Sequence, residues 1–127
     1  MLSRDALCAH ADHWIACWNA RNLDGILAPF APDACFISPL ATTLTGRATI
    51  SGVEALRAYW EEALRQAPLL HFRPVGTVCD EERQTLVVIY EVDRPDGTTR
   101  AVEIMTFRDG RQITGEALYG ARQPCAG

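Results

Sequence analysis

The sequence contains no lysine and no run of basic residues. Its 127 residues include twelve basic side chains, all arginine and scattered between Arg4 and Arg122, and the formal net charge is -4. A surface that binds nucleic acid needs clustered positive charge to neutralise phosphates. No nucleic-acid partner is therefore expected.

Long apolar runs are also missing. Residues 1–18 include Arg4, Asp5 and Asp12 and hold no uninterrupted apolar stretch of the length found in signal peptides. No later segment approaches the roughly 20 apolar residues that cross a bilayer. The sequence predicts no contact with a membrane and a cytoplasmic location.

Motifs for metal, cofactor or covalent chemistry are absent as well. The sequence has no serine nucleophile elbow, no phosphate-binding glycine loop and no dinucleotide fingerprint, so no cofactor is expected. His10, His13 and Cys17 share one flank of a predicted helix, but zinc needs three or four ligands, and a helix flank beside the core is the interpretation we favour. A disulfide framework or C-x-x-C zinc site is not expected from five widely spaced cysteines, which are Cys8, Cys17, Cys35, Cys79 and Cys125.

The first half of the chain has a helical pattern. Apolar residues recur at helical spacing, and a capping box at Ser51 to Glu54, in which side chains would cap backbone amides, marks the start of a third helix. The predicted elements are a helix over residues 3–21, a short helix between Asn22 and Pro32, a strand over 34–38 with a hairpin partner over 42–47, and a helix ending at Pro68.

The second half has the alternation of strands. With 48% hydrophobic residues the chain is long enough for one domain with a sizeable core, spanning 1–127. Helices followed by a meander predict an α+β fold with three helices packed on one face of an antiparallel sheet. The predicted strands are 70–79, 84–93, 98–108 and 111–121, with turns at 94–97 and 109–110.

One carboxylate, Glu103, interrupts an apolar run from Ala101 to Phe107. A loop at 94–97 places Val88 opposite Glu103, and the resulting Glu91/Arg100 pair supports that register. The position of Glu103 relative to the last strand depends on the next hairpin.

That hairpin has two possible registers. A two-residue turn at Asp109-Gly110 would place Glu103 opposite Glu116, which is an unfavourable like-charge pair. A three-residue loop places Glu103 opposite Gly115, and this register is preferred. It gathers on one face Val88, Tyr90, Ala101, Glu103, Met105, Gly115, Ala117 and Tyr119.

Small residues beside Glu103 predict a cavity on this face, because a filled core would use leucines there. The opposite face is too apolar to remain in water and predicts a homodimer interface. Its residues are Val87, Ile89, Val102, Ile104 and Leu118.

The carboxyl group of Glu103 is the leading catalytic candidate. An apolar cavity should raise its pKa, so that it acts as a general base or a neutral donor near pH 7. An ion pair with Arg57 or Arg73 is the structural alternative. His71 would pair with Glu103 if its strand turns it inward, and otherwise is an exposed edge residue.

The aromatic side chains are candidates for lining the pocket. Trp14, Trp18 and Trp60 are core residues on two helical stripes, and at least one of them is expected to line the cavity. Tyr90 and Tyr119 face the cavity and can hydrogen-bond a carbonyl group.

Four segments resemble the nuclear transport factor 2-like superfamily, in its SnoaL-like and ketosteroid-isomerase-like branches. The similarity covers nearly the whole chain, although such motifs specify a fold better than a reaction. The segments are Trp14-Ile15-x-x-Trp18-Asn19-Ala20-Arg21-Asn22-Leu23, Phe30-Ala31-Pro32-Asp33-Ala34, Gly52-Val53-x-Ala55-Leu56-x-x-Tyr59, and Phe107-x-x-Gly110 to Tyr119.

This resemblance implies a curved antiparallel sheet wrapped by three helices into a cone (a cystatin-like α+β roll) with an apolar pocket, usually in a homodimer. Ketosteroid isomerases use an aspartate base, a tyrosine and a protonated acid. The matching positions here are Ser38, Trp14 and Glu103, so only the acid is kept. The resemblance therefore favours polyketide-cyclase-like chemistry over steroid isomerisation.

Three functions remain open. The first is a cofactor-independent isomerase, cyclase or dehydratase acting on a small hydrophobic carbonyl compound. The second is a non-catalytic protein that binds such a molecule, and the third is an interaction domain. The residues expected to bind the small molecule are Trp14, Trp18, Ser38, Trp60, Val88, Tyr90, Met105, Ala117 and Tyr119.

Overall fold

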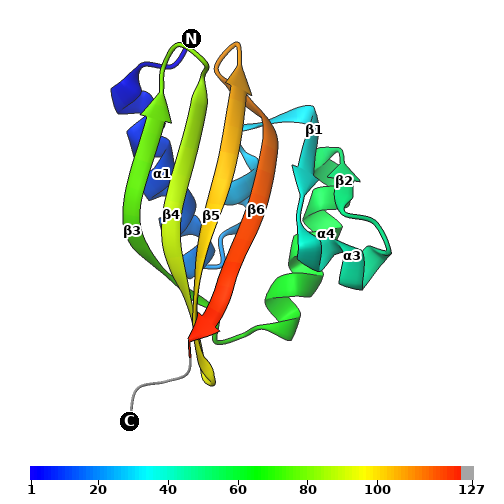
Figure 1. Cartoon of the computed structure of the whole chain (residues 1–127). Coiled ribbons are helices and arrows are strands. Elements are labelled where there is room, and N and C mark those ends of the chain that lie inside the picture. Colours follow the sequence, from blue (N-terminus) through cyan, green and yellow to red (C-terminus); the bar gives the residue numbers. More distant parts are fainter. Residues whose placement is uncertain (124–127) are drawn as a thin grey trace.

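Six strands form one curved sheet that does not close into a barrel, and four helices accompany it (Figure 1). The computed structural model describes residues 1–123. The elements are α1 (Arg4–Asn19), α2 (Leu23–Leu27), β1 (Phe30–Ile37), α3 (Pro39–Thr45), β2 (Thr49–Ser51), α4 (Val53–Gln66), β3 (His71–Asp80), β4 (Thr85–Arg94), β5 (Gly97–Arg108) and β6 (Arg111–Gln123).

The strand order is β2-β1-β6-β5-β4-β3. Helix α1 packs against β3 and β4, and α4 packs against β1. Figure 1 shows α1 behind the sheet, with α3 and α4 beside β1 and β2. The buried residues of helices and strands meet between these layers, so one face of the sheet is covered and the other is open. This agrees with the predicted α+β class.

Side-chain caps explain where the first two helices begin. The Ser3 hydroxyl accepts a hydrogen bond from the amide of Ala6 at 3.1 Å, and the Asn22 side chain accepts one from the amide of Gly25 at 3.0 Å. Both segments form the predicted helices. Helix α2 is shorter than predicted, because the chain enters β1 at Phe30.

The predicted strand over 42–47 is wrong, because residues Pro39–Thr45 form helix α3. The Ser38 hydroxyl caps this helix at the amide of Leu40, Pro39 occupies its first turn, and Gly46 ends it with φ 81°. These end signals outweigh the strand propensity of the threonines. The partner of β1 is β2, in which Ile50 pairs with Phe36.

The capping box at Ser51 is also wrong. Gly52 is the N-cap of α4, with φ 90°, and no side chain caps the helix. Ser51 belongs to β2, where its hydroxyl oxygen lies 3.5 Å from the sulfur of Cys35. Strand pairing of Ser51 with Cys35 removes it from the position that a capping residue needs.

One strand pair is parallel, unlike the rest of the sheet. β1 runs parallel to β6, with Phe36 opposite Gly115, whereas the other four pairs are antiparallel. The predicted antiparallel sheet thus describes most of the observed sheet. Local turn signals predict only hairpins between consecutive strands, and β1 and β6 are joined by no turn.

The register between β4 and β5 is confirmed, with Val88 opposite Glu103 and Glu91 opposite Arg100. The register between β5 and β6 is wrong by two residues, since Glu103 lies opposite Ala117 rather than Gly115. A shift of two keeps every side chain on its predicted face.

The β5–β6 hairpin avoids the like-charge pair in an unexpected way. Asp109 and Gly110 form a two-residue turn with φ of 52° and 79°, as in type I′ hairpins. The ladder then shifts by one residue between the pairs of Phe107 and Thr106. This bulge, rather than a longer loop, places Glu116 opposite Ile104.

Candidate functional site

Glu103 lies near the middle of β5 on the helix-covered face, and its side chain is only 3% exposed. Its strand neighbours are Val88 and Ala117. Burial raises the pKa of the Glu103 carboxyl group to about 8, and the negative charge of Glu116 adds to this shift. Glu103 is therefore mainly protonated and neutral at pH 7.

Both arginines that could have neutralised Glu103 have other partners. Arg57 forms an ion pair with Asp24 at 2.8 Å, and Arg73 binds Asp93 and Glu91. Within the described residues 1–123 no ion pair involves Glu103. The structural alternative of an ion pair to Arg57 or Arg73 is wrong.

Three tyrosines interact electrostatically with Glu103. A charge on this carboxylate would raise the pKa values of Tyr59, Tyr90 and Tyr119, each already raised by burial, and the pKa of Tyr119 reaches about 12. The Ser38 hydroxyl interacts with the phenols of Tyr59 and Tyr119 and opposes these shifts. We call these five residues the Glu103 cluster.

A cavity of about 120 Å³ adjoins this cluster. Tyr59 from α4 and Tyr119 from β6 belong to both the cluster and the cavity wall, so the phenols connect Glu103 with the cavity. The lining residues are Trp18, Phe36, Leu40, Tyr59, Trp60, Ala63, Ala67, Leu70, Phe72, Val92, Arg94 and Tyr119.

The cavity contains only part of the predicted lining. Trp18, Trp60 and Tyr119 line it, and their roles in binding stay predictions. The other predicted residues are not in its wall and are buried in the core; they are Trp14, Ser38, Val88, Tyr90, Met105 and Ala117.

The Glu103 carboxyl group does not line the 120 Å³ cavity, and the open space expected directly beside it stays a prediction. The rings of Trp14 and Phe72 pack on Tyr90, with centroids 5.1 and 4.7 Å away. A β-carbon on Gly115 would lie 3.1 Å from the Glu103 carboxylate. The missing side chain at Gly115 thus makes room for the carboxyl group of Glu103 itself.

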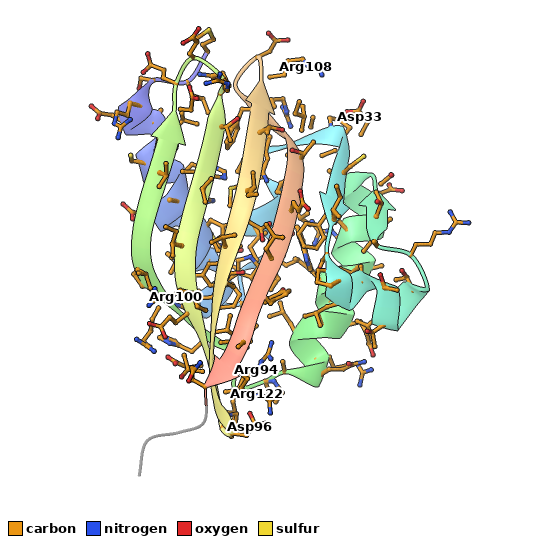
Figure 2. All side chains as sticks on the ribbon, in the orientation of Figure 1. Asp33, Arg94, Asp96, Arg100, Arg108 and Arg122 are labelled. Atoms are coloured by element: carbon orange, nitrogen blue, oxygen red, sulfur yellow. The ribbon has the colours of Figure 1, made fainter. Side chains whose placement is uncertain are left out.

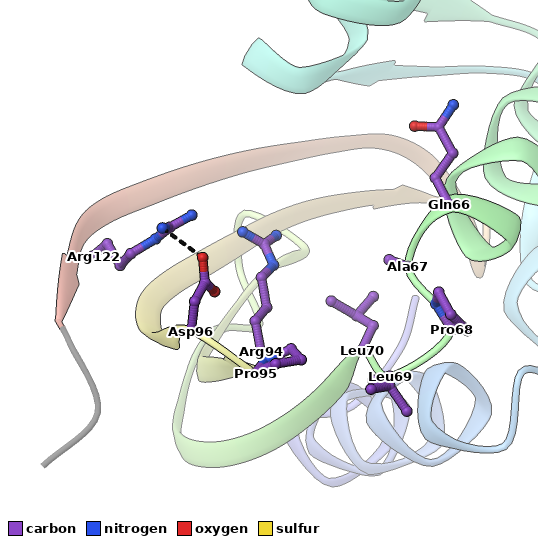
Figure 3. A pocket seen from close by; sticks show the side chains of 9 residues that line it. All are labelled: Gln66, Ala67, Pro68, Leu69, Leu70, Arg94, Pro95, Asp96 and Arg122. Atoms are coloured by element: carbon purple, nitrogen blue, oxygen red, sulfur yellow. Dashed lines mark hydrogen bonds and ion pairs between the residues drawn. The ribbon is translucent and has the colours of Figure 1, made fainter. Parts of the chain in front are cut away.

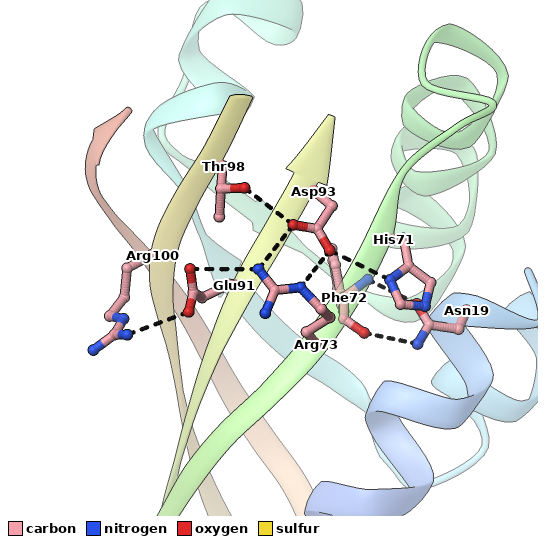
Figure 4. A network of polar contacts seen from close by, with 8 residues as sticks. All are labelled: Asn19, His71, Phe72, Arg73, Glu91, Asp93, Thr98 and Arg100. Carbon is pink, nitrogen blue, oxygen red and sulfur yellow. Dashed lines mark hydrogen bonds and ion pairs between the residues drawn. The ribbon is translucent and has the colours of Figure 1, made fainter. Parts of the chain in front are cut away.

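His71 points away from the cavity. Its imidazole is 56% exposed and lies 3.7 Å from a carboxylate oxygen of Asp93 (Figure 4). Alternation along β3 puts the neighbouring Phe72 inside, held by hydrogen bonds between its backbone and the Asn19 side chain. An inward-facing His71 paired with Glu103 is wrong.

The histidines of α1 are better explained as part of the packing than as metal ligands. His10 packs edge-on against Phe107, and burial, followed by the charge of His13, lowers its pKa to about 4. His13 bonds the carbonyl oxygen of Gly25 at 2.8 Å. The described part of the chain, which excludes Cys125, contains no group of three or more His, Cys, Asp or Glu suited to a metal ion.

Sequence reasoning missed Tyr59 and Arg94. Strand alternation gave a signal for Arg94, because it follows Val88, Tyr90 and Val92 on the inner face of β4. Tyr59 sits next to the apolar stripe of α4, and nothing in the sequence distinguishes it from a half-exposed helix residue.

The layered fold and the cavity between α4 and the sheet define an α+β protein with an interior cavity. No described helix is both long and apolar enough to span a bilayer. Residues 11–114 match the family model of the SnoaL-like domain. The chain belongs to the SnoaL-like family.

Solved structures show the same architecture. A SnoaL-like protein of unknown function from Burkholderia thailandensis is 29% identical, with a TM-score of 0.84 over 94% of this chain and 98% of the other. A protein of unknown function with a cystatin-like fold from Methylobium petroleophilum is 20% identical, with a TM-score of 0.78 over 96% and 80%. A candidate polyketide cyclase from Sinorhizobium meliloti is 21% identical, with a TM-score of 0.70 over 84% and 91%.

Proposed function

We propose that this protein is a cofactor-independent enzyme of the isomerase or cyclase type, acting by acid/base chemistry on a small hydrophobic carbonyl compound. One observation carries the proposal: within residues 1–123 Glu103 is buried without an ion pair, and it interacts electrostatically with Tyr119 and Tyr59, which line an apolar cavity. Buried acids with shifted pKa values next to cavities are typical of catalytic groups.

The Glu103 cluster would act on the carbonyl oxygen of the substrate. Phenols in the cavity wall donate hydrogen bonds to that oxygen. As a water molecule at the cavity mouth takes the α-proton of the substrate, negative charge develops on the oxygen, and the protonated Glu103 supplies a proton to it, so that the enol forms and Glu103 is left as a carboxylate that is reprotonated from solvent. Apolar walls exclude water and strengthen these interactions. This role requires the neutral form of Glu103, so activity should fall as the pH rises through about 8.

The similar structures support the fold and do not identify a reaction. One relative of similar fold is described as a candidate polyketide cyclase, but at 21% identity it shares only the fold with this chain. Steroid isomerisation is not favoured, because Ser38 brings a hydroxyl group and no carboxylate to the cluster.

The test is exchange of the protons next to a ketone. The protein is incubated with 2-tetralone in D₂O, and the loss of the α-proton signals is followed by NMR. We expect the wild type to accelerate exchange and Glu103→Gln to lose about a hundredfold of this acceleration, because the amide donates but cannot transfer a proton. Glu91→Gln, on the outer face, serves as the matched control.

A non-catalytic binding protein is the second candidate. One observation favours it: no residue that lines the cavity is a carboxylate or an imidazole. Binding of 2-tetralone with no faster exchange in the wild type would support this candidate and contradict the enzyme.

We also propose a homodimer through the uncovered face of the sheet. Its central residues are only partly buried in the single chain, and Leu118 is 46% exposed. A second copy would remove this apolar surface from water. The residues concerned are Val87, Ile89, Val102, Ile104 and Leu118.

A further inference from the structure

Arg94 is the last residue of β4 and lies on the inner face of the strand, after Tyr90 and Val92. Its backbone is fixed by the final rung of the β4–β5 ladder, opposite Gly97. The side chain leaves the sheet at the end where β4 turns into β5 (Figure 2).

Two hollows meet at Arg94. It lines the 120 Å³ cavity next to the Glu103 cluster, and it also lines a more open hollow of about 370 Å³ (Figure 3). Ala67 and Leu70 are the other two residues shared by both walls. Arg94 thus stands at the entrance from the outer hollow to the inner cavity.

The charge of Arg94 is not neutralised within residues 1–123, where its guanidinium has neither a hydrogen bond nor an ion pair. Its neighbour Asp96 is bound by Arg122 at 2.7 Å (Figure 3), and Asp93 is bound by Arg73 and Thr98. The nearby acidic groups are therefore already engaged. A half-buried guanidinium of this kind favours an anion.

The field of Arg94 reaches the interior. It lowers the pKa values of Tyr90 and Tyr119, although burial raises both more strongly. The cavity wall also contains an unsatisfied donor, because the buried indole N–H of Trp18 has no acceptor in the described part of the chain. All other lining side chains apart from the two phenols are apolar.

We propose that the substrate or ligand of this cavity is a hydrophobic carbonyl compound that also carries a carboxylate or similar planar oxyanion, which Arg94 binds at the entrance. The apolar rings contact the hydrophobic part of the molecule, and its carbonyl oxygen faces the phenols. Recognition by two ends would fix the orientation of the molecule relative to the Glu103 cluster. This assignment rests on the function proposed above.

Two probes of equal shape test the assignment. Sodium 2-naphthoate and neutral 2-naphthamide are titrated into ¹⁵N-labelled protein at low salt, and the indole N–H signals of the tryptophans report binding. We expect the wild type to bind the carboxylate about tenfold more tightly, as a charge-assisted hydrogen bond provides. Arg94→Met should remove this preference and leave the affinity for the amide unchanged.

Controls separate the role of Arg94 from general effects of charge. Arg83→Met removes an exposed arginine that is paired with Asp80 in the β3–β4 turn, and it should keep the tenfold preference. Arg94→Lys keeps the charge without the planar fork and should show an intermediate preference, so it carries the test if Arg94→Met fails to fold.

The outcomes distinguish the two proposals. Equal binding of both probes by the wild type, or a preference that survives in Arg94→Met, overturns the role of Arg94 and leaves the cavity as a binding site. If neither probe shifts the indole signal of Trp18 or Trp60, the cavity does not bind such molecules, and the proposed function falls together with the role of Arg94.

Discussion

The carboxyl groups on the two faces of the sheet lie in opposite environments. On the outer face Glu91 and Asp93 are held by Arg73, and Arg100 also binds Glu91 (Figure 4). A hydrogen bond from Arg73 lowers the pKa of Asp93. On the inner face Glu103 has no cationic partner among the described residues, and burial raises its pKa to about 8.

The difference shows which carboxyl groups can take part in acid/base chemistry. On the outer face the lowered pKa of Asp93 keeps this group charged, and the partly exposed ion pairs contribute little to stability because water screens them. The inner carboxyl group stays neutral at pH 7 and can donate a hydrogen bond or a proton. Alternation along adjacent strands is enough to create both environments.

The largest expected effect concerns the inner carboxyl group. Folded Glu103 binds its proton more tightly than the unfolded chain does, so its contribution to wild-type stability is greatest below pH 4.5 and is lost as the pH rises from there through about 8. This loss is on the order of 5 kcal/mol. Glu103→Gln should lack it and gain stability relative to the wild type across this range, as measured by urea unfolding at pH 5, 7 and 8.

A constant difference between Glu103→Gln and the wild type at all three pH values would contradict a raised pKa. His10, whose pKa is lowered, gives a slope of the opposite sign between about pH 4 and 6.5, but it is present in both proteins and cancels in their difference.

The outer face is tested next by Ile104→Glu. In a homodimer the change buries two unpaired charges, and we expect association to weaken roughly a hundredfold, about 3 kcal/mol. Sedimentation at micromolar concentration measures it. Leu44→Glu alters an exposed leucine of α3 and should leave the dimer intact. A wild type that is monomeric at this concentration would refute the interface.

Alanine substitutions at two glycines test how tightly the two faces of the sheet are packed. In Gly115→Ala the new methyl group would lie 3.1 Å from the Glu103 carboxylate and 3.3 Å from the Gln112 amide, so we expect a loss of about 1–2 kcal/mol in unfolding free energy. Gly76→Ala meets nothing within 4 Å and should change stability by less than about 0.5 kcal/mol. Equal effects in thermal unfolding would contradict the close contact at Gly115.

The smallest effect is expected for the outer ion pairs. Arg73 and Asp93 are 48% and 33% exposed, so Arg73→Met should cost less than about 1 kcal/mol, and the cost should shrink at high salt. The pKa of Asp93 should rise towards its ordinary value, measured by carboxyl NMR titration. A loss of several kcal/mol would mean that this network is not screened.

The strands of the second half were predictable because hairpins are local. The sequence 94–97 and the Glu91/Arg100 pair fixed one register correctly. The next register failed because a bulge after a type I′ turn solves the same charge problem as a longer loop, and the sequence carries no sign of which is used. The assignment of residues to the two faces was correct because the register error was two residues, which is an even number.

The cavity could be predicted only in part. The small residues Gly115 and Ala117 predicted an open space, but the space at Gly115 is occupied by the Glu103 carboxyl group. The cavity opens nearer to α4, where residues of distant elements meet. Contacts of this kind depend on how the helices pack on the sheet. The spacing of residues within one segment does not determine that packing.

The sequence by itself determined the α+β class, the inner and outer faces of the meander and the burial of Glu103, because alternation is a property of each strand. Only the tertiary structure decided that β6 pairs with β1 in parallel, that His71 faces water and that Arg94, which has no partner within residues 1–123, stands at the cavity entrance. These features depend on contacts between segments far apart in the chain, and their geometry is set by packing.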